Sequence, residues 1–318
     1  MNSTCCLFIE PVLHQVLPPV LIVEFALGMA GNGVGLWMSF RLKAWKPNSV
    51  YLLNLSLADF LVLFCLLFRT DYYIRRKNWV YGDVPCRMLL FMLAANRAAG
   101  IIFLTAVAVD RYLRIVHPFH RLNRVSARGA VLVSSILWVI VVAMTVYLLA
   151  EPHLFQFQNS TQCESFNICP DSFSTAIWHD AYYIWQFLVP LGIISYCTVC
   201  ITLQLRGSTI DRDGRILKAV RCVLAITIVF TICYFPSNIT RISILVRKFQ
   251  RTERCEDFRN FSLAFYCSVC FTYFYSMLNP VVYYFSNPNF KGLFKGFWQK
   301  LSHAEAEESP SFQIMADN

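Results

Sequence analysis

Seven apolar segments, each long enough to cross a lipid bilayer, constrain this chain more than any other feature. They cover residues 17–41, 48–72, 84–114, 128–150, 180–205, 217–246 and 259–285. A helix needs about 20 apolar residues to cross the hydrocarbon core, where only helices and closed barrels satisfy their own backbone hydrogen bonds. None of the segments shows the alternating polarity of a barrel strand. The sequence therefore predicts an all-α bundle of seven transmembrane helices.

Charged residues are scarce, as expected for such a bundle. They make up 15% of the 318 residues, against about 25% in a typical soluble domain. This composition excludes a disordered chain and an ordinary soluble enzyme. After the seventh segment, apolar residues recur at helical spacing beside lysines, which predicts an amphipathic helix lying on membrane lipid. The expected parts are an N-terminal segment (1–16), the bundle (17–285), the amphipathic helix (286–302) and a disordered tail (303–318).

The distribution of basic residues predicts the orientation of the bundle. Of the 28 Lys and Arg residues, 16 lie in one set of connections or at the segment ends beside them, and nine lie in or beside the opposite set. Because cytoplasmic loops are the richer in Lys and Arg, we expect a multi-pass plasma-membrane protein with an extracellular N-terminus. Asn2 and Asn159 each begin an N-glycosylation acceptor pattern, and both fall outside in this orientation.

The cysteines divide into two groups. Seven of the 13 lie in apolar segments, where we interpret them as small buried hydrophobic residues. The other six lie in connections predicted to be extracellular or, for Cys86, at the outer end of the segment 84–114: Cys5, Cys6, Cys86, Cys163, Cys169 and Cys255. An even number in an oxidising compartment suggests three disulfides, and the residues alone allow 15 pairings. Such bridges would hold the outer loops as a lid over the bundle.

Three arginines fall inside apolar segments, in the halves predicted to face outward: Arg69, Arg97 and Arg241. Charge inside a membrane is costly, so such residues face the bundle interior and are usually functional. Arg97 follows Cys86 by eleven residues, or roughly 16 Å along a helix, beyond easy reach of the surface. Guanidinium stays ionised when desolvated and grips a carboxylate through two hydrogen bonds. The pattern predicts a cationic pocket that binds a small anion, most simply a carboxylate.

Structural roles for the same arginines are the alternatives. Arg97 could pair with Glu24 or Asp59, and Arg69 could pair with Asp71, its neighbour in sequence. Arg69 and Arg241 are predicted to lie nearer the membrane surface than Arg97. They could instead extend their charged ends into water.

The half of the bundle predicted to face the cytoplasm carries another polar group. Asp59, with Asn32 and Asn279 as neighbours, could bind a cation or stabilise an inactive packing. The sequence contains no phosphate-binding loop, HExxH pair or GxSxG turn, so we expect no enzyme activity, metal site or nucleic-acid partner. The two halves show no repeat of the kind that many transporters carry. A carboxylate transporter is nevertheless the alternative from another functional class.

Several short motifs, taken in order, are typical of one receptor family. They are Gly31-Asn32, Leu57-Ala58-Asp59, Asp110-Arg111-Tyr112, Trp138, Pro190, Cys233-Tyr234-Phe235-Pro236 and Asn279-Pro280-Val281-Val282-Tyr283. Over essentially its whole length the chain resembles the rhodopsin-family G-protein-coupled receptors. It is most similar to the hydroxycarboxylic acid receptors in the segments 68–73, 82–87, 96–97, 163–166, 271–273 and 280–286.

The resemblance implies a ligand and partners. Receptors of this subfamily respond to lactate, 3-hydroxybutyrate and related acids, so a small carboxylate is the expected ligand. Coupling to an inhibitory G protein, which lowers cyclic AMP, and binding of arrestin are also expected. Neighbouring subfamilies recognise oxidised long-chain fatty acids, and a ligand of that kind is the alternative.

The resemblance also implies roles for particular residues. Arg97 would bind the ligand carboxylate, with Arg241, Tyr273 and Ser165 as further contacts. The expected disulfides are Cys86–Cys163, Cys5–Cys169 and Cys6–Cys255. Activation and G-protein coupling would involve Asp110, Arg111, Tyr112, Tyr234, Pro236, Asn279, Pro280 and Tyr283.

Three departures from the subfamily pattern bear on these roles. A sodium ion is expected near Asp59, but Gly100 stands where the family often has the Ser of that site. Asn279 stands where close relatives usually have Asp. Glu164 places a negative charge beside the expected carboxylate site.

Overall fold

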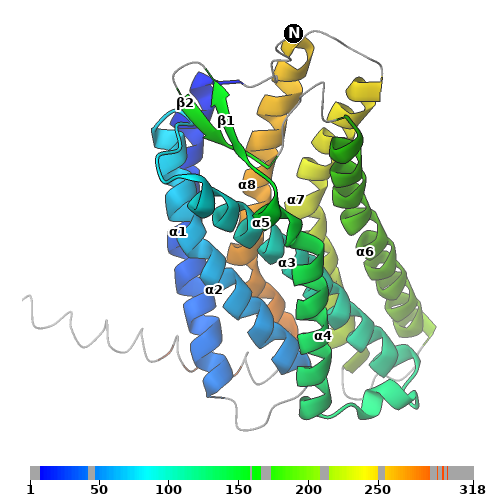
Figure 1. Ribbon diagram of the computed structural model, residues 1–318. Coiled ribbons are helices and arrows are strands. Elements are labelled where there is room, and N and C mark those ends of the chain that lie inside the picture. Colours follow the sequence, from blue (N-terminus) through cyan, green and yellow to red (C-terminus); the bar gives the residue numbers. More distant parts are fainter. Residues whose placement is uncertain are drawn as a thin grey trace, which may run out of the picture.

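The computed structural model describes residues 8–41, 47–157, 160–165, 173–207, 215–249 and 255–286, with the single residues 292, 296 and 299. Within these ranges seven helices are long and apolar enough to cross a membrane, which confirms the predicted bundle (Figure 1). They are α1 (Pro11–Phe40), α2 (Pro47–Ile74), α3 (Asp83–Val116), α4 (Ala127–Thr145), α6 (Phe173–Gly207), α7 (Arg215–Phe249) and α8 (Cys255–Ser286).

Helix α3 is the central element of the bundle. It packs against α2, α4, α6 and α7, whereas α1 packs mainly against α2 and α8. Around the middle of α3 the residues are small and fully buried, as in Ala98 and Ala99, which lets neighbouring helices approach closely. Helix α4 instead exposes large apolar side chains, among them Leu132 at 64% and Val139 at 69%. Such exposure is expected of a face that contacts lipid.

Helices α1 and α4 differ from the predicted segments at one end each. Helix α1 begins at Pro11 rather than at residue 17, because proline suits the first turn and Pro18 and Pro19 are accommodated inside the helix. Helix α4 ends at Thr145 rather than at residue 150. The Thr145 hydroxyl donates to the carbonyl of Val141 at 2.8 Å, a bond that favours bending of a helix. The short helix α5 (Tyr147–Ala150) follows.

Two short strands, which the sequence analysis did not predict, follow α5. Strands β1 (Leu154–Phe157) and β2 (Ser160–Cys163) pair antiparallel, with Leu154 opposite Cys163. This hairpin lies at the upper end of the bundle in Figure 1; we call that end the hairpin end. A 3₁₀ turn, η1 (Arg121–Arg124), connects α3 to α4 at the opposite end.

A disulfide fixes the hairpin to the bundle. Cys86, in the first turn of α3, is bonded to Cys163 at the end of β2, with 5.8 Å between the Cα atoms. This confirms one predicted bridge. Cys255 is also disulfide-bonded, to a partner outside the described residues. The seven cysteines inside apolar segments carry free thiols: Cys65, Cys197, Cys200, Cys222, Cys233, Cys267 and Cys270.

Several sequence-based predictions fall on residues that the structure does not describe. They concern the glycosylation sites Asn2 and Asn159, the bridge Cys5–Cys169 and the Cys6 partner of Cys255. The tail and most of the expected amphipathic helix also lie outside the described ranges. These remain predictions.

Candidate functional site

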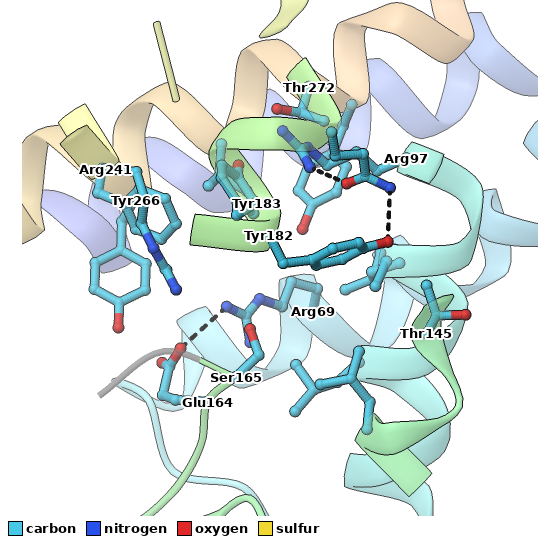
Figure 2. A pocket seen from close by; sticks show the side chains of 18 of the residues that line it. Arg69, Arg97, Thr145, Glu164, Ser165, Tyr182, Tyr183, Arg241, Tyr266 and Thr272 are labelled. Carbon is cyan, nitrogen blue, oxygen red and sulfur yellow. Dashed lines mark hydrogen bonds and ion pairs between the residues drawn. The ribbon is translucent and has the colours of Figure 1, made fainter. Parts of the chain in front are cut away.

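A cavity of about 130 Å³ lies within the bundle, toward its hairpin end (Figure 2). Its walls come from α2 to α8, and from the residues just after β2. The lining includes all five side chains that the sequence analysis assigned to ligand binding: Arg69, Arg97, Ser165, Arg241 and Tyr273. Residues more than 200 positions apart in the chain, such as Arg69 and Tyr273, therefore meet in one place.

Arg97 lies at the centre of this arrangement and is 7% exposed. One terminal nitrogen of its guanidinium donates to Gln186 Oε1 at 2.6 Å, and the other to Asn238 Oδ1 at 3.5 Å. The group also lies 3.6 Å from the centre of the Tyr183 ring. Both hydrogen-bond acceptors are neutral amides. They hold the guanidinium in place without cancelling its charge.

The predicted alternative, an ion pair with Glu24 or Asp59, does not form among the described residues. The Asp59 carboxylate accepts from Asn96 at 3.0 Å and from Ser276 at 2.9 Å. Glu24 is buried, and neither of its carboxyl oxygens has a hydrogen-bond partner in the part of the chain that is described. The charge on Arg97 is thus not neutralised by either acid.

Arg241 shares an aromatic neighbour with Arg97. Its guanidinium lies 5.2 Å from the centre of the Tyr183 ring and 5.3 Å from that of Phe265, distances at which a cation is attracted to the face of an aromatic ring. Arg241 is 6% exposed and lines the cavity. Its side chain is buried and does not extend into water, which was the alternative for this residue.

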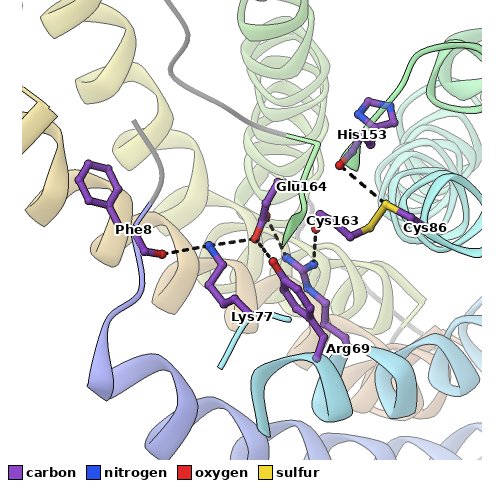
Figure 3. A network of polar contacts seen from close by, with 8 residues as sticks. Phe8, Arg69, Lys77, Cys86, His153, Cys163 and Glu164 are labelled. Carbon is purple, nitrogen blue, oxygen red and sulfur yellow. Dashed lines mark hydrogen bonds and ion pairs between the residues drawn. A yellow bond between two sulfur atoms is a disulfide. The ribbon is translucent and has the colours of Figure 1, made fainter. Parts of the chain in front are cut away.

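Arg69 belongs to a buried ion cluster (Figure 3). Its guanidinium lies 3.4 Å from the carboxylate of Glu164 and donates to the carbonyl of Cys163 at 3.2 Å. Lys77 lies 3.0 Å from the same carboxylate, and the Tyr72 hydroxyl donates to it at 2.8 Å. The predicted alternative, a pair between Arg69 and Asp71, was wrong.

The end of α2 explains how Lys77 reaches Glu164. The amides of Arg76 and Lys77 donate to the carbonyls of Tyr73 and Tyr72, closing the helix as a Schellman motif. Arg76 and Lys77 have φ angles of 54° and 62°, in a region that non-glycine residues rarely adopt. The turn brings the Lys77 ammonium against Glu164 and within 3.4 Å of the Phe8 carbonyl.

The cluster keeps Glu164 ionised. Burial raises the pKa of its carboxyl group, but the charges of Lys77 and Arg69, with the hydrogen bonds from Tyr72 and Lys77, outweigh that effect and hold the pKa below its usual value. Arg69 is therefore occupied by a carboxylate of the protein itself. Arg97, by contrast, faces the cavity with neutral hydrogen-bond partners.

Comparison with known proteins identifies this architecture. The sequence profile described as "7 transmembrane receptor (rhodopsin family)" matches residues 31–283. The chain belongs to the rhodopsin family of receptors. It is 47% identical to human hydroxycarboxylic acid receptor 3, over 92% of this chain and 75% of that protein. It is 45% identical to human hydroxycarboxylic acid receptor 1, over 91% of this chain and 82% of that protein.

A third relative carries a name from a different ligand class. The mouse 12-(S)-hydroxy-5,8,10,14-eicosatetraenoic acid receptor is 38% identical, over 98% of both chains. This receptor is thus related to hydroxycarboxylic acid and to eicosanoid receptors, and it is not an enzyme. Family membership gives it a small-molecule ligand, a G-protein partner and a multi-pass location in the plasma membrane.

The sodium ion near Asp59 stays a prediction, and the polar groups around this carboxylate are bonded to one another. The carboxylate already accepts from Asn96 and Ser276, and the Asn32 amide donates to the carbonyl of Ser276 at 2.7 Å. Gly100 offers no side-chain oxygen. The space beside it holds buried aromatic groups, since a Cβ atom there would lie 2.6 Å from both the Tyr234 hydroxyl and the Tyr275 ring.

This packing predicts the effect of one added methyl group. Gly100→Ala should destabilise the receptor by about 1–3 kcal/mol, because the rings of Tyr234 and Tyr275 are fully buried and must shift. The melting temperature of the purified receptor measures this. Gly33→Ala is the matched control, since nothing lies within 4 Å of its added Cβ atom. Equal melting temperatures for the two variants would contradict the close packing at Gly100.

The residues predicted to act in activation are not among those that line the cavity. Asp110 accepts two hydrogen bonds from Arg114, at 2.9 and 3.0 Å, and the Tyr112 hydroxyl lies 3.0 Å from a ring nitrogen of His117. Arg111 also lies in the last turns of α3, and Pro236 lies inside α7. Tyr234 is fully buried. Asn279, Pro280 and Tyr283 belong to α8, but their side chains are outside the described set.

Sequence reasoning missed the partners of Arg97. Gln186 is a polar residue in a largely apolar segment, four positions before Pro190, and polar side chains inside a membrane bundle commonly form hydrogen bonds between helices. Asn238 also lies in an apolar segment, and the sequence around it gives no sign that it would face Arg97. Lys77 looked like one of three basic residues in a loop. Only the fold brings these residues to their partners.

Proposed function

We propose that this receptor binds a small hydroxymonocarboxylate, such as lactate or 3-hydroxybutyrate, from the extracellular side. The hairpin end and the N-terminus would face outward, and the opposite end would bind an inhibitory G protein that lowers cyclic AMP. One observation carries the proposal: the buried guanidinium of Arg97, held by neutral amides, lines a small cavity.

The hydrogen-bonding capacity of Arg97 supports a carboxylate ligand. Guanidinium has five N–H groups and no acceptor. Gln186 and Asn238 each accept from a different terminal nitrogen, so three N–H groups remain for a ligand. A carboxylate would bring the negative charge that the amides lack, and a charge-assisted pair of this kind is about twice as strong as a neutral hydrogen bond.

The size of the cavity favours a short acid over a long one. Pockets for drug-sized ligands usually measure about 300–1,000 Å³, whereas this cavity measures about 130 Å³. A hydroxylated long-chain fatty acid, the ligand class named for one relative, would require the helices to move apart. It remains the second candidate. The transporter alternative is set aside because the matched family consists of receptors.

Signalling would follow from a shift between two arrangements of the bundle. Arg97 lies 5.8 Å from the centre of the Tyr234 ring on α7, so a carboxylate on Arg97 is linked to a helix that contains Pro236. A ligand that binds the active arrangement more tightly raises its population. Arrestin and the surrounding lipid are the other expected partners.

The test is a cyclic-AMP assay in cells that express the receptor. Lactate, 3-hydroxybutyrate, nicotinate and a hydroxyeicosanoid are compared, with untransfected cells as the control. We expect the short hydroxy acids to lower cyclic AMP and the effect to disappear when inhibitory G proteins are inactivated. A response to the hydroxyeicosanoid alone would favour the second candidate.

A further inference from the structure

Helix α6 places two polar side chains one turn apart beside Arg97. Tyr182 and Gln186 both line the cavity, and neither was predicted to be a site residue. In Figure 2 the Tyr182 hydroxyl lies on the Arg97 side of the cavity, while the Glu164 side chain lies apart from it. The amide of Gln186 connects the two groups. Its oxygen lies 2.6 Å from Arg97, and its nitrogen donates to the Tyr182 hydroxyl oxygen at 3.3 Å.

The chemistry of these groups fixes the direction of every hydrogen bond. Arginine can only donate, so the Gln186 oxygen must be the acceptor that faces it. The amide nitrogen of Gln186 then faces Tyr182 and can only donate. The Tyr182 oxygen therefore accepts this bond, and its own O–H group is left to donate elsewhere. Within the described residues no acceptor for that O–H group is found.

The cavity thus presents two different donors at a short separation. Arg97 offers charged N–H groups, and Tyr182 offers a neutral O–H group one amide away. A carboxylate is the better acceptor for the charged donor, and a neutral oxygen is sufficient for the other. A hydroxy acid carries one acceptor of each kind: a charged carboxylate and, one or two carbon atoms away, a neutral hydroxyl oxygen.

We propose that Tyr182 recognises the hydroxyl group of the ligand by donating a hydrogen bond to it, and that Gln186 orients Tyr182 for this task. The inference rests on the proposed function, since it assumes a carboxylate on Arg97. It adds a reason why a hydroxy acid is preferred to the unsubstituted acid of the same length. Without the hydroxyl, the Tyr182 O–H group loses an acceptor.

The first experiment varies the ligand on the unchanged receptor. Lactate, pyruvate and propionate have the same carbon chain, but only lactate and pyruvate carry an acceptor oxygen on the second carbon. We expect the concentration needed for half-maximal suppression of cyclic AMP to be about tenfold higher for propionate, as the loss of one hydrogen bond predicts. Pyruvate should act much like lactate, because Tyr182 needs an acceptor and not a donor. Pyruvate as weak as propionate would overturn the proposal.

The second experiment removes the donor. Tyr182→Phe should lower the potency of lactate about tenfold more than that of propionate, so that the ratio between the two ligands approaches one. Tyr81→Phe is the matched control, because its hydroxyl bonds to Asp71 outside the cavity and the ratio should stay as in the unchanged receptor. Cell-surface labelling shows that each variant is present at the membrane.

The outcomes separate this proposal from the proposed function. A receptor that responds to none of these acids overturns both. A receptor that responds to lactate and propionate, but whose Tyr182→Phe variant keeps the original ratio, overturns the role of Tyr182 alone. Gln186→Glu should give a different pattern. It places a carboxylate at the position 2.6 Å from Arg97, which should lower the potency of all the acids alike, whether or not they carry a hydroxyl.

Discussion

Replacing Arg97 by Ala is expected to abolish the response to every carboxylate that activates the unchanged receptor. The substitution removes the buried cation that the ligand would neutralise, and loss of such a charged partner costs about 2–5 kcal/mol. This corresponds to a loss of potency from about 30-fold to several thousandfold. The amides of Gln186 and Asn238 cannot replace the missing charge. Dose–response curves for cyclic AMP, at matched surface expression, measure the effect.

Two further variants make this test specific. Arg259→Ala removes the same side chain from an exposed ion pair with Glu10, so potency should be unchanged. Arg97→Lys keeps the charge but loses the planar fork that contacts two amides at once, so it should retain only a weak response. An Arg97→Ala receptor with the original dose–response curve would refute the ligand role of this residue.

The second large effect is expected at Glu164. Glu164→Ala leaves Arg69 and Lys77 buried without their shared carboxylate, and breaking a buried ion pair in this way costs about 3–5 kcal/mol. The melting temperature of the purified receptor should fall sharply. The triple substitution Glu164→Gln with Arg69→Met and Lys77→Met should recover part of the loss, because it removes the stranded charges.

An exposed acid on the same end of the bundle provides the control. Asp71 pairs with Arg75 at 2.6 Å, and both side chains are substantially exposed. Exposed ion pairs contribute about 0–1 kcal/mol to the free energy of unfolding. Asp71→Ala should therefore change the melting temperature little. If Glu164→Ala were as stable as Asp71→Ala, the buried cluster would not stabilise the fold as described.

The seven-helix bundle and the depth of Arg97 in it could be predicted from the sequence. Both depend on lengths and distances within a single segment of the chain. The length of an apolar segment decides whether it can span a bilayer, and the distance of Arg97 from each end of its segment places it beyond easy reach of either membrane surface. The alternative pairing of Arg69 with Asp71 was wrong for a reason that also lies within one helix. Side chains two positions apart on a helix do not face each other, and Asp71 instead contacts Arg75, four positions away.

The partners of Arg97 and Glu164 could not be predicted in the same way. Gln186 and Asn238 lie 89 and 141 positions from Arg97, on helices whose rotation depends on the packing of the whole bundle. Lys77 reaches Glu164 only through two residues with positive φ angles at the end of α2. The hairpin that positions Glu164 is eight paired residues long, too short to stand out in the sequence.

Cys163, Glu164 and Ser165 are consecutive, so a covalent bond, an ion cluster and a wall of the cavity occupy three adjacent positions. A substitution in this stretch that altered ligand preference would also disturb the attachment of the hairpin. On the cavity side of α6, Tyr182 belongs to no disulfide or ion pair within the described residues. Divergence toward new ligands among related receptors should therefore proceed more readily through a position such as 182 than through the stretch 163–165.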